Sequence, residues 1–224
     1  MGGKALKLIQ PVSKRDQVVA SFKEAILSGV IQPGEAIVES KVAQQLGAGI
    51  PLVREALIEL EHQGYVRKVP YKGTTVTKLE RQDVEQIFRL RVELETLAIE
   101  WAKERVAAED VEYLREVTAK MKRAAQALDL NAFYENDLAF HRKIWEMSGN
   151  EYLADGLERI VVPLFAFFVM KNRRERKSYL ESAASHEQIV EALPRLSGAK
   201  LRSVMRASLS DWKTETLDAL LPKE

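Results

Sequence analysis

The stretch "IQPGEAIVESKVAQQLGAGIPLVREALIELEHQGYVRKVPYKGTTVTKL", residues 31–79, decides the fold of the first third of this 224-residue chain. Two short segments flank its Gly47-Ala48-Gly49 turn, at about 39–46 and 51–63. Apolar side chains recur at helical spacing in both segments, and Pro51 is well suited to the first turn of a helix. The pattern predicts two helices joined by a tight turn.

The segments on either side of this pair complete a small domain. An amphipathic segment at about 13–28 predicts an earlier helix, with Ser13 as its cap. Two β-prone segments, 65–69 and 74–78, surround Tyr71-Lys72-Gly73, which is a hairpin signal. Three helices followed by a basic hairpin predict a winged helix-turn-helix.

Composition excludes several classes of protein. The chain is 46% hydrophobic and 30% charged, as expected of an ordinary globular protein. It has no Cys, which rules out disulfides, Cys-ligated zinc, iron–sulfur clusters and thiol catalysis. The N-terminal residues MGGKALKLIQ lack the apolar core of a signal peptide, and no apolar run is long enough to span a membrane. We therefore expect a cytoplasmic location and no membrane partner.

The charge is unevenly distributed, although the net charge is only +1. Residues 1–78 contain 11 basic and 7 acidic side chains, whereas the remainder contains 23 basic and 26 acidic ones. A basic N-terminal part on an acidic body is typical of a nucleic-acid-binding domain joined to a separate module, although chance explains a split of this size equally well.

Neither Gly nor Pro occurs between Thr74 and Ser148, which indicates long uninterrupted helices. The fold class we expect is mainly α: a winged helix-turn-helix domain with a small β-hairpin wing over 1–79, then an all-α helical bundle over 80–224. Amphipathic periodicity predicts the bundle helices at about 81–105, 109–128, 131–148, 150–171, 174–193 and 197–219.

The N-terminal stretch resembles the DNA-binding domain of the GntR family of bacterial transcription regulators. The matching positions are Pro33-Gly34-Glu35, Leu46-Gly47, Val53-Arg54-Glu55-Ala56-Leu57, Leu60-Glu61, Gly64 and Gly73. The resemblance implies binding to double-stranded DNA, with Arg54 making a bidentate contact to guanine and the wing approaching the backbone. The DNA-contacting residues that we predict are Ser40, Lys41, Pro51, Arg54, Arg67, Lys72 and Gly73. The alternative for Arg54 is an ion pair with Glu55 or Glu61 on a solvated surface.

One turn departs from the family pattern. Family members usually have Ser-Arg-Thr-Pro where this chain has Gly49-Ile50-Pro51-Leu52. Glycine is an adequate helix cap, but Ile50 replaces a cation that contacts DNA in the family and presents an apolar side chain instead. Losing a phosphate contact weakens DNA binding and its salt dependence. A binding module with weakened or lost DNA affinity is therefore an alternative to a regulator.

The chemistry-bearing residues of the second domain are Asp137, His141 and His186. Asp137 and His141 are four residues apart, so both project from one helix face, as a pair of metal ligands requires. The same spacing also suits hydrogen-bonded core residues. Arg91 lies on an apolar helix face, where it needs an acidic partner, either a ligand or Glu95 one turn later.

The stretches "RLRVELE" (89–95), "DLAFHRKIWEMSGNEYL" (137–153) and "SHEQIVEAL" (185–193) are similar to the helical effector domain, of the FCD type, of the FadR branch of GntR regulators. This resemblance implies a divalent metal, zinc or nickel, held by Asp137, His141 and His186. Ser208 stands where the family has a fourth His. A hydroxyl is a poor ligand for such metals, so water or effector would complete the site. We predict effector contacts by Arg91, Asn150 and Ser208.

Together these observations predict a homodimeric transcription regulator, a repressor by family default, that binds a palindromic operator and senses a small carboxylate. We do not expect an enzyme. The competing hypothesis from another class is a metal-dependent enzyme built on Asp137, His141 and His186. It leaves the winged helix unexplained.

Overall fold

The computed structural model describes residues 13–171 and 176–221, without the side chains of 211–220. The chain divides into two compact units, Met1–Val76 and Thr77–Glu224, and each is described by itself. Among the described residues, no helix combines the length and apolar character that crossing a membrane requires.

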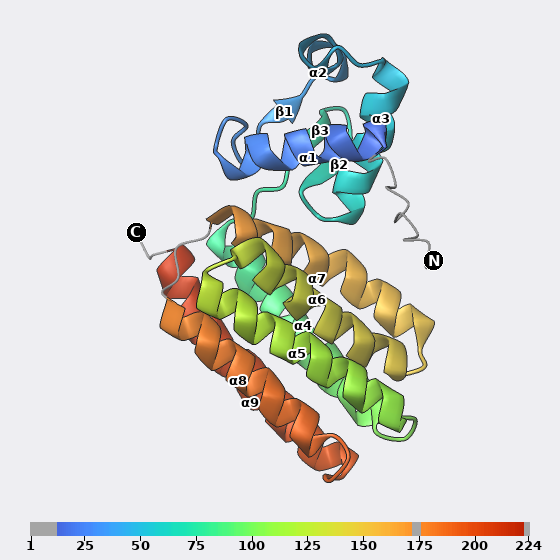
Figure 1. Cartoon of the computed structure of the whole chain (residues 1–224), viewed down its shortest axis with the longest axis vertical. Coiled ribbons are helices and arrows are strands. Elements are labelled where there is room, and N and C mark those ends of the chain that lie inside the picture. The colour runs from blue at the N-terminus through green and yellow to red at the C-terminus, as the bar shows by residue number, and fades with distance from the viewer. Residues whose placement is uncertain (1–12, 172–175, 222–224) are drawn as a thin grey trace, which may run out of the picture. The chain divides into compact units, whose positions relative to one another are not determined.

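The first unit is a winged helix-turn-helix, as the sequence predicts (Figure 1). Its elements are α1 (Lys14–Leu27), β1 (Ala36–Ile37), α2 (Glu39–Leu46), α3 (Ile50–His62), β2 (Val66–Val69) and β3 (Gly73–Val76). The Ser13 side chain caps α1 by accepting a hydrogen bond from the backbone N–H of Asp16. Gly47 ends α2 in the left-handed conformation that glycine adopts without strain, which makes the turn into α3 tight.

The three strands form an antiparallel sheet in the order β1-β3-β2. The hairpin pairs Val66 with Val76 and Val69 with Gly73, so the wing turn covers residues 70–72. The two-residue strand β1 pairs with the other edge of β3 and lies outside the strands that the sequence predicts. Helices α1 and α3 pack against each other. The core of this unit includes Phe22, Ile26, Val53, Ala56, Leu60, Val66 and Val76.

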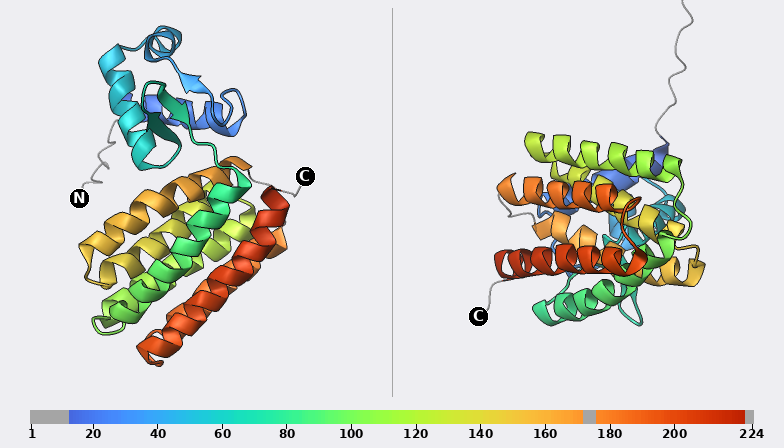
Figure 2. Two further views of the ribbon diagram at one scale, coloured as in Figure 1. Left: turned by 180° about the vertical axis from the view of Figure 1, so that it is seen from behind. Right: turned by 90° about the horizontal axis from the view of Figure 1, so that it is seen from below.

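The second unit is an all-helical bundle. Its helices are α4 (Arg81–Ala102), α5 (Ala108–Ala127), α6 (Leu130–Met147), α7 (Glu151–Lys171), α8 (Arg176–Ala192) and α9 (Gly198–Leu220). Helices α5 and α8 lie side by side on one face (Figure 1), and α4 and α9 lie side by side on the opposite face (Figure 2). Helix α6 packs on α4, α5 and α7, which places it in the interior of the bundle.

Aromatic side chains from four helices, α4, α6, α7 and α8, fill the bundle. The largest fully buried ones are Phe88, Phe133, Phe140, Trp145, Phe167, Phe168 and Tyr179. Ionisable residues are buried among them on α4, α6 and α8. Burying charge in such a core costs free energy unless the charges meet each other or a ligand, so these residues mark the site.

Leu128 adopts an unfavourable backbone conformation where the chain leaves α5. It follows α5 with a φ of 56°, and the N–H of Asp129 reaches back to the Ala124 carbonyl at 3.0 Å, so the chain leaves the helix through a left-handed residue. This conformation costs a residue with a side chain about 1 kcal/mol, whereas glycine adopts it without that cost. Because Leu128 is exposed, Leu128→Gly should raise the free energy of unfolding by about that amount in urea denaturation. Leu128→Ala keeps the strain and should give no gain, and equal values for both variants would contradict this account.

Candidate functional site

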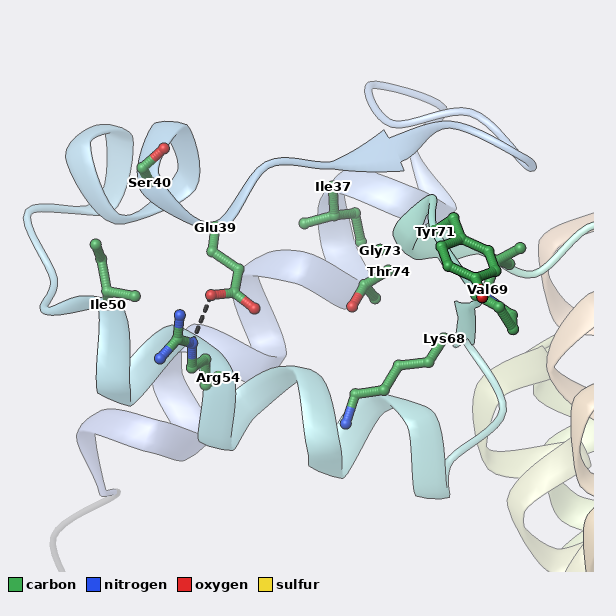
Figure 3. Close-up of a pocket in the computed structure, with 11 residues that line it drawn as sticks. Ile37, Glu39, Ser40, Ile50, Arg54, Lys68, Val69, Tyr71, Gly73 and Thr74 are labelled. Carbon is green, nitrogen blue, oxygen red and sulfur yellow. Dashed lines mark hydrogen bonds and ion pairs between the residues drawn. The ribbon is translucent and has the colours of Figure 1, made fainter.

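The exposed face of the first unit combines the start of α3 with the wing. A concave surface there is lined by Ile37, Glu39, Ser40, Ile50, Arg54, Lys68, Val69, Pro70, Tyr71, Gly73 and Thr74 (Figure 3). All seven DNA-contacting residues predicted from the sequence are exposed, and three of them, Ser40, Arg54 and Gly73, line this surface. The other predicted residues lie on α2, α3, β2 and the wing turn, outside its lining.

Arg54 is held in place by an acid on the preceding helix. Its Nε donates to Oε2 of Glu39 at 2.6 Å, while the Arg54 side chain remains 66% exposed (Figure 3). The alternative ion pair predicted from the sequence, between Arg54 and Glu55 or Glu61, is therefore wrong. Glu39 begins α2, and the tight turn between the helices brings the start of α2 beside α3. Glu39 and Arg54 are 15 positions apart in the sequence, so helical spacing does not reveal their contact. The contact uses Nε, and no described residue accepts a hydrogen bond from the two terminal Nη groups.

The turn before α3 presents Ile50 and an uncapped helix end. No side chain caps α3 at Gly49, so the first N–H groups of this helix stay available to a phosphate. Ile50 is the first residue of α3 and is 39% exposed despite its apolar side chain. At the tip of the wing, Tyr71 adopts a φ of 64° and is fully exposed.

In the second unit, Asp137 and His141 on α6 meet His186 on α8. All three side chains are buried, and one ligand-type atom of each lies within 4.8 Å of the others. His186 Nε2 is 3.0 Å and His141 Nε2 is 3.4 Å from Oδ1 of Asp137. The three residues that the sequence analysis singled out therefore lie together.

The hydrogen bonds of the two imidazoles fix which nitrogen faces the cluster. His186 Nδ1 donates to the Ser182 carbonyl at 2.8 Å, and His141 Nδ1 donates to the Glu95 carboxylate. Nε2 is therefore the nitrogen of each ring that lies toward Oδ1 of Asp137, and it carries a lone pair when the ring is neutral. That oxygen is buried and accepts no hydrogen bond of good geometry. Three electron-rich atoms that converge in this way need a proton or a cation between them.

Arg91 and Glu95, one turn apart on α4, supply the surrounding charge. Arg91 Nε donates to Oε1 of Glu95 at 2.5 Å, and both side chains are almost completely buried. Arg91 also donates through Nη2 to His141 Nε2 at 2.8 Å. Sequence spacing identified Glu95 as a partner of Arg91 but missed its second contact with His141, which comes from a helix 46 residues later.

These contacts set the protonation states. Burial by itself would raise the pKa of Glu95, but the charges of Arg91 and His141 hold this pKa at about 2. Burial likewise opposes ionisation of Asp137, yet His186 and His141 hold its pKa well below the ordinary value. Burial lowers the pKa of His141, and the Glu95 carboxylate more than offsets that effect, so the pKa is raised. Both carboxylates are therefore ionised at neutral pH.

Ser208 and Asn150 take places outside this cluster. Ser208, on α9, shares a hydrogen bond of 2.7 Å with Ser185, the residue that precedes His186 on α8. Asn150 caps α7 by accepting from the N–H of Leu153 at 3.0 Å, and it lines a different pocket. The structure thus brings Arg91 to the three ligand-type residues but does not place Asn150 among them.

The donor set fits a divalent metal. One carboxylate oxygen and two imidazole nitrogens match the preference of zinc for nitrogen and oxygen ligands, and a three-ligand site leaves a position open. The Glu95 contact to His141 is the kind of outer hydrogen bond that orients a metal-ligating imidazole. The unsatisfied Oδ1 of Asp137 is the observation that such an ion would explain.

The first unit is a winged helix-turn-helix, and the second is a helical domain that contains this internal cluster. Together they define a DNA-binding regulator with an appended ligand-binding domain. Family models match both parts: "Bacterial regulatory proteins, gntR family" over residues 14–76 and "FCD domain" over residues 86–211. The chain belongs to the GntR family and carries an FCD domain, as the sequence resemblance indicates.

Curated relatives agree with this membership, and solved structures share the fold. The regulator McbR of Escherichia coli is 28% identical over 151 residues, which are 67% of this chain and 68% of McbR. Its solved structure covers 94% of this chain and 98% of its own, with a TM-score of 0.66 and 24% identity. A gluconate operon repressor of Bacillus licheniformis is 24% identical over 91% of this chain and 83% of its own length. A solved FCD domain, described as metal-free, covers 64% of this chain and 97% of its own, with a TM-score of 0.53 and 17% identity.

Glu95→Gln tests the buried charge network. Removing one partner of a buried ion pair leaves the other charge uncompensated, which typically costs about 3–5 kcal/mol. We expect a loss of this size in the free energy of unfolding, measured in urea. Glu93→Gln is the matched control, because Glu93 lies on the same helix and pairs with Arg206 on the exposed surface. That variant should change stability little, and similar losses in the two variants would contradict the analysis.

Proposed function

We propose that this protein is a ligand-responsive transcription regulator whose winged helix binds DNA and whose FCD domain senses a small carboxylate beside a divalent metal. The observation that carries the proposal is a GntR winged helix with an exposed, oriented Arg54 near the start of α3, in one chain with the Asp137, His141 and His186 cluster. Regulation of transcription by binding DNA follows the family, and two relatives are named repressors of a gluconate operon.

The geometry of the first unit supports DNA binding. In a helix-turn-helix the N-terminal part of the second helix contacts base edges in the major groove. Arg54 lies in that part of α3, with its terminal Nη groups available for a bidentate contact to guanine. Lys41, Arg67 and Lys72 are exposed on neighbouring elements and suit phosphate contacts.

The metal half of the proposal assigns Asp137, His141 and His186 as protein ligands of zinc or nickel. When bound, the ion would supply a positive charge and an open position that attract a carboxylate. The protein's own part is to hold the two Nε2 lone pairs toward Asp137, through the Glu95 and Ser182 contacts to the imidazoles. Arg91 adds a second positive charge at the same place and is our proposed effector contact.

We further propose that the protein acts as a homodimer on a palindromic operator and that it represses transcription. Most oligomeric proteins have a two-fold axis, and such a dimer reads two half-sites related by the same symmetry. An effector would shift the spacing of the two winged helices to the extent that it binds one arrangement more tightly than the other.

DNA binding is tested by fluorescence anisotropy of the full chain, with its own upstream DNA and a scrambled control at two salt concentrations. We expect a salt-sensitive preference for the upstream fragment, and Arg54→Ala should lower it by about tenfold or more. Arg195→Ala is the control, because Arg195 is also exposed and paired with a glutamate, but on the helical domain. If the upstream and scrambled fragments bind equally, the proposal of a regulator that acts on its own promoter is wrong.

The metal site is tested by zinc titration with a competing chelator. Asp137→Asn should weaken zinc binding at least tenfold, because a neutral amide replaces the ionised ligand. Ser208→His should tighten binding, because it supplies an imidazole where the family has its fourth ligand, on the helix α9 that packs against α8. Ser203→His is the control, one turn and a half earlier on α9 and exposed. An unchanged affinity in both Asp137→Asn and Ser208→His would place any bound zinc elsewhere.

A further inference from the structure

The exposure of the apolar Ile50 side chain needs a physical explanation beyond the absence of the cation that the GntR family has at this position. Single exposed apolar residues are common on protein surfaces and carry no meaning alone. Ile50, however, is the first residue of α3 and lines the same concave surface as Arg54 and Lys68. Ile50 stands at the N-terminal end of the helix that carries Arg54. If Arg54 contacts bases in the major groove, the apolar side chain of Ile50 contacts the DNA as well.

The spacing of Ile50 and Arg54 fixes what lies opposite each of them. Four residues apart on α3, they project from the same side of the helix, and both line the pocket in Figure 3. Their separation along the helix axis is about 6 Å, from a rise of about 1.5 Å per residue. Base pairs are about 3.4 Å apart, so the two side chains reach bases within about two steps of each other.

Glu39 decides how Arg54 presents itself. Because Glu39 takes Nε, the two terminal Nη groups are left for an end-on contact with the two acceptors of a guanine. An Arg54 fixed in this way does not also reach the base opposite Ile50. That base is contacted by a side chain that neither donates nor accepts a hydrogen bond and that offers no charge to a phosphate.

Resting on the proposed DNA-binding function, we propose that Ile50 is a specificity-determining residue that reads the 5-methyl group of a thymine within about two base pairs of the guanine read by Arg54. The thymine methyl is the apolar group that a base pair offers in the major groove, and it distinguishes this base from the other three. Contact with Ile50 removes both apolar groups from water, which favours thymine at that position. With isoleucine in place of the family's cation at position 50, the protein loses affinity for DNA of any sequence and gains discrimination between bases.

The experiment uses the wild-type chain and replaces thymine by deoxyuridine, which lacks only the methyl group. Preferred duplexes are first selected by the protein from a pool with a randomised central segment. In the selected duplex each thymine is then replaced singly by deoxyuridine, and Kd is measured by anisotropy at fixed salt. We expect one position, within about two base pairs of a guanine, at which Kd rises about fourfold, the effect of one buried methyl group.

Variants assign that effect to Ile50. Ile50→Ala should bind the thymine and deoxyuridine duplexes equally well. Ile58→Ala is the matched control, because Ile58 lies on the same helix with 47% exposure but does not line the concave surface, and it should keep the fourfold difference. Ile50→Arg should bind all duplexes more tightly with a steeper salt dependence, and should lose the difference.

The outcomes separate this inference from the function on which it rests. If the pool yields preferred sequences but deoxyuridine changes Kd at no position, Ile50 does not read a methyl group and the inference is wrong. It is also wrong if Ile50→Ala keeps the fourfold difference. If no sequence is preferred over the starting pool, the DNA-binding proposal itself fails, and the reading by Ile50 fails with it.

Discussion

Charge buried inside the helical bundle is the constraint on which the second unit depends. Five ionisable side chains from three helices lie together with almost no contact with water. Each would be costly alone, so each must be placed where a neighbour compensates it. The Glu95 carboxylate does this for Arg91 and His141 at once, and it thereby ties α4 to α6. The bundle must keep these helices in register for the charges to be tolerated at all.

The fold was largely accessible from the sequence because its signals are local. Helical periodicity, the Ser13 cap and the Gly47 turn each act within a few residues, and they place the helices to within about three residues of their observed ends. The strand β1 was missed because it has two residues and exists only through pairing with β3. Two residues are too few to show an alternating pattern.

The candidate sites were accessible only in part, because their contacts join distant segments. Asp137 and His141 share a helix face, so spacing alone brings them together. The contact of Glu95 with His141 and that of Glu39 with Arg54 cross between helices, and neither leaves a periodic signal. Sequence patterns identify which residues carry chemistry, but the packing of helices decides which of them meet. Asn150, in contrast, caps α7 through a local contact with Leu153, three residues later.

The hydrogen bond from Arg91 to His141 would couple the proposed metal ion to the charge of Arg91. A lone pair serves one partner at a time, so a cation that takes Nε2 of His141 must first release Nη2 of Arg91. Arg91, still held by Glu95 through Nε, would then turn this N–H group toward a carboxylate acceptor. Under the proposed function, a bound metal ion would therefore create the site at which Arg91 contacts the effector carboxylate, and the affinity for the effector would depend on the metal.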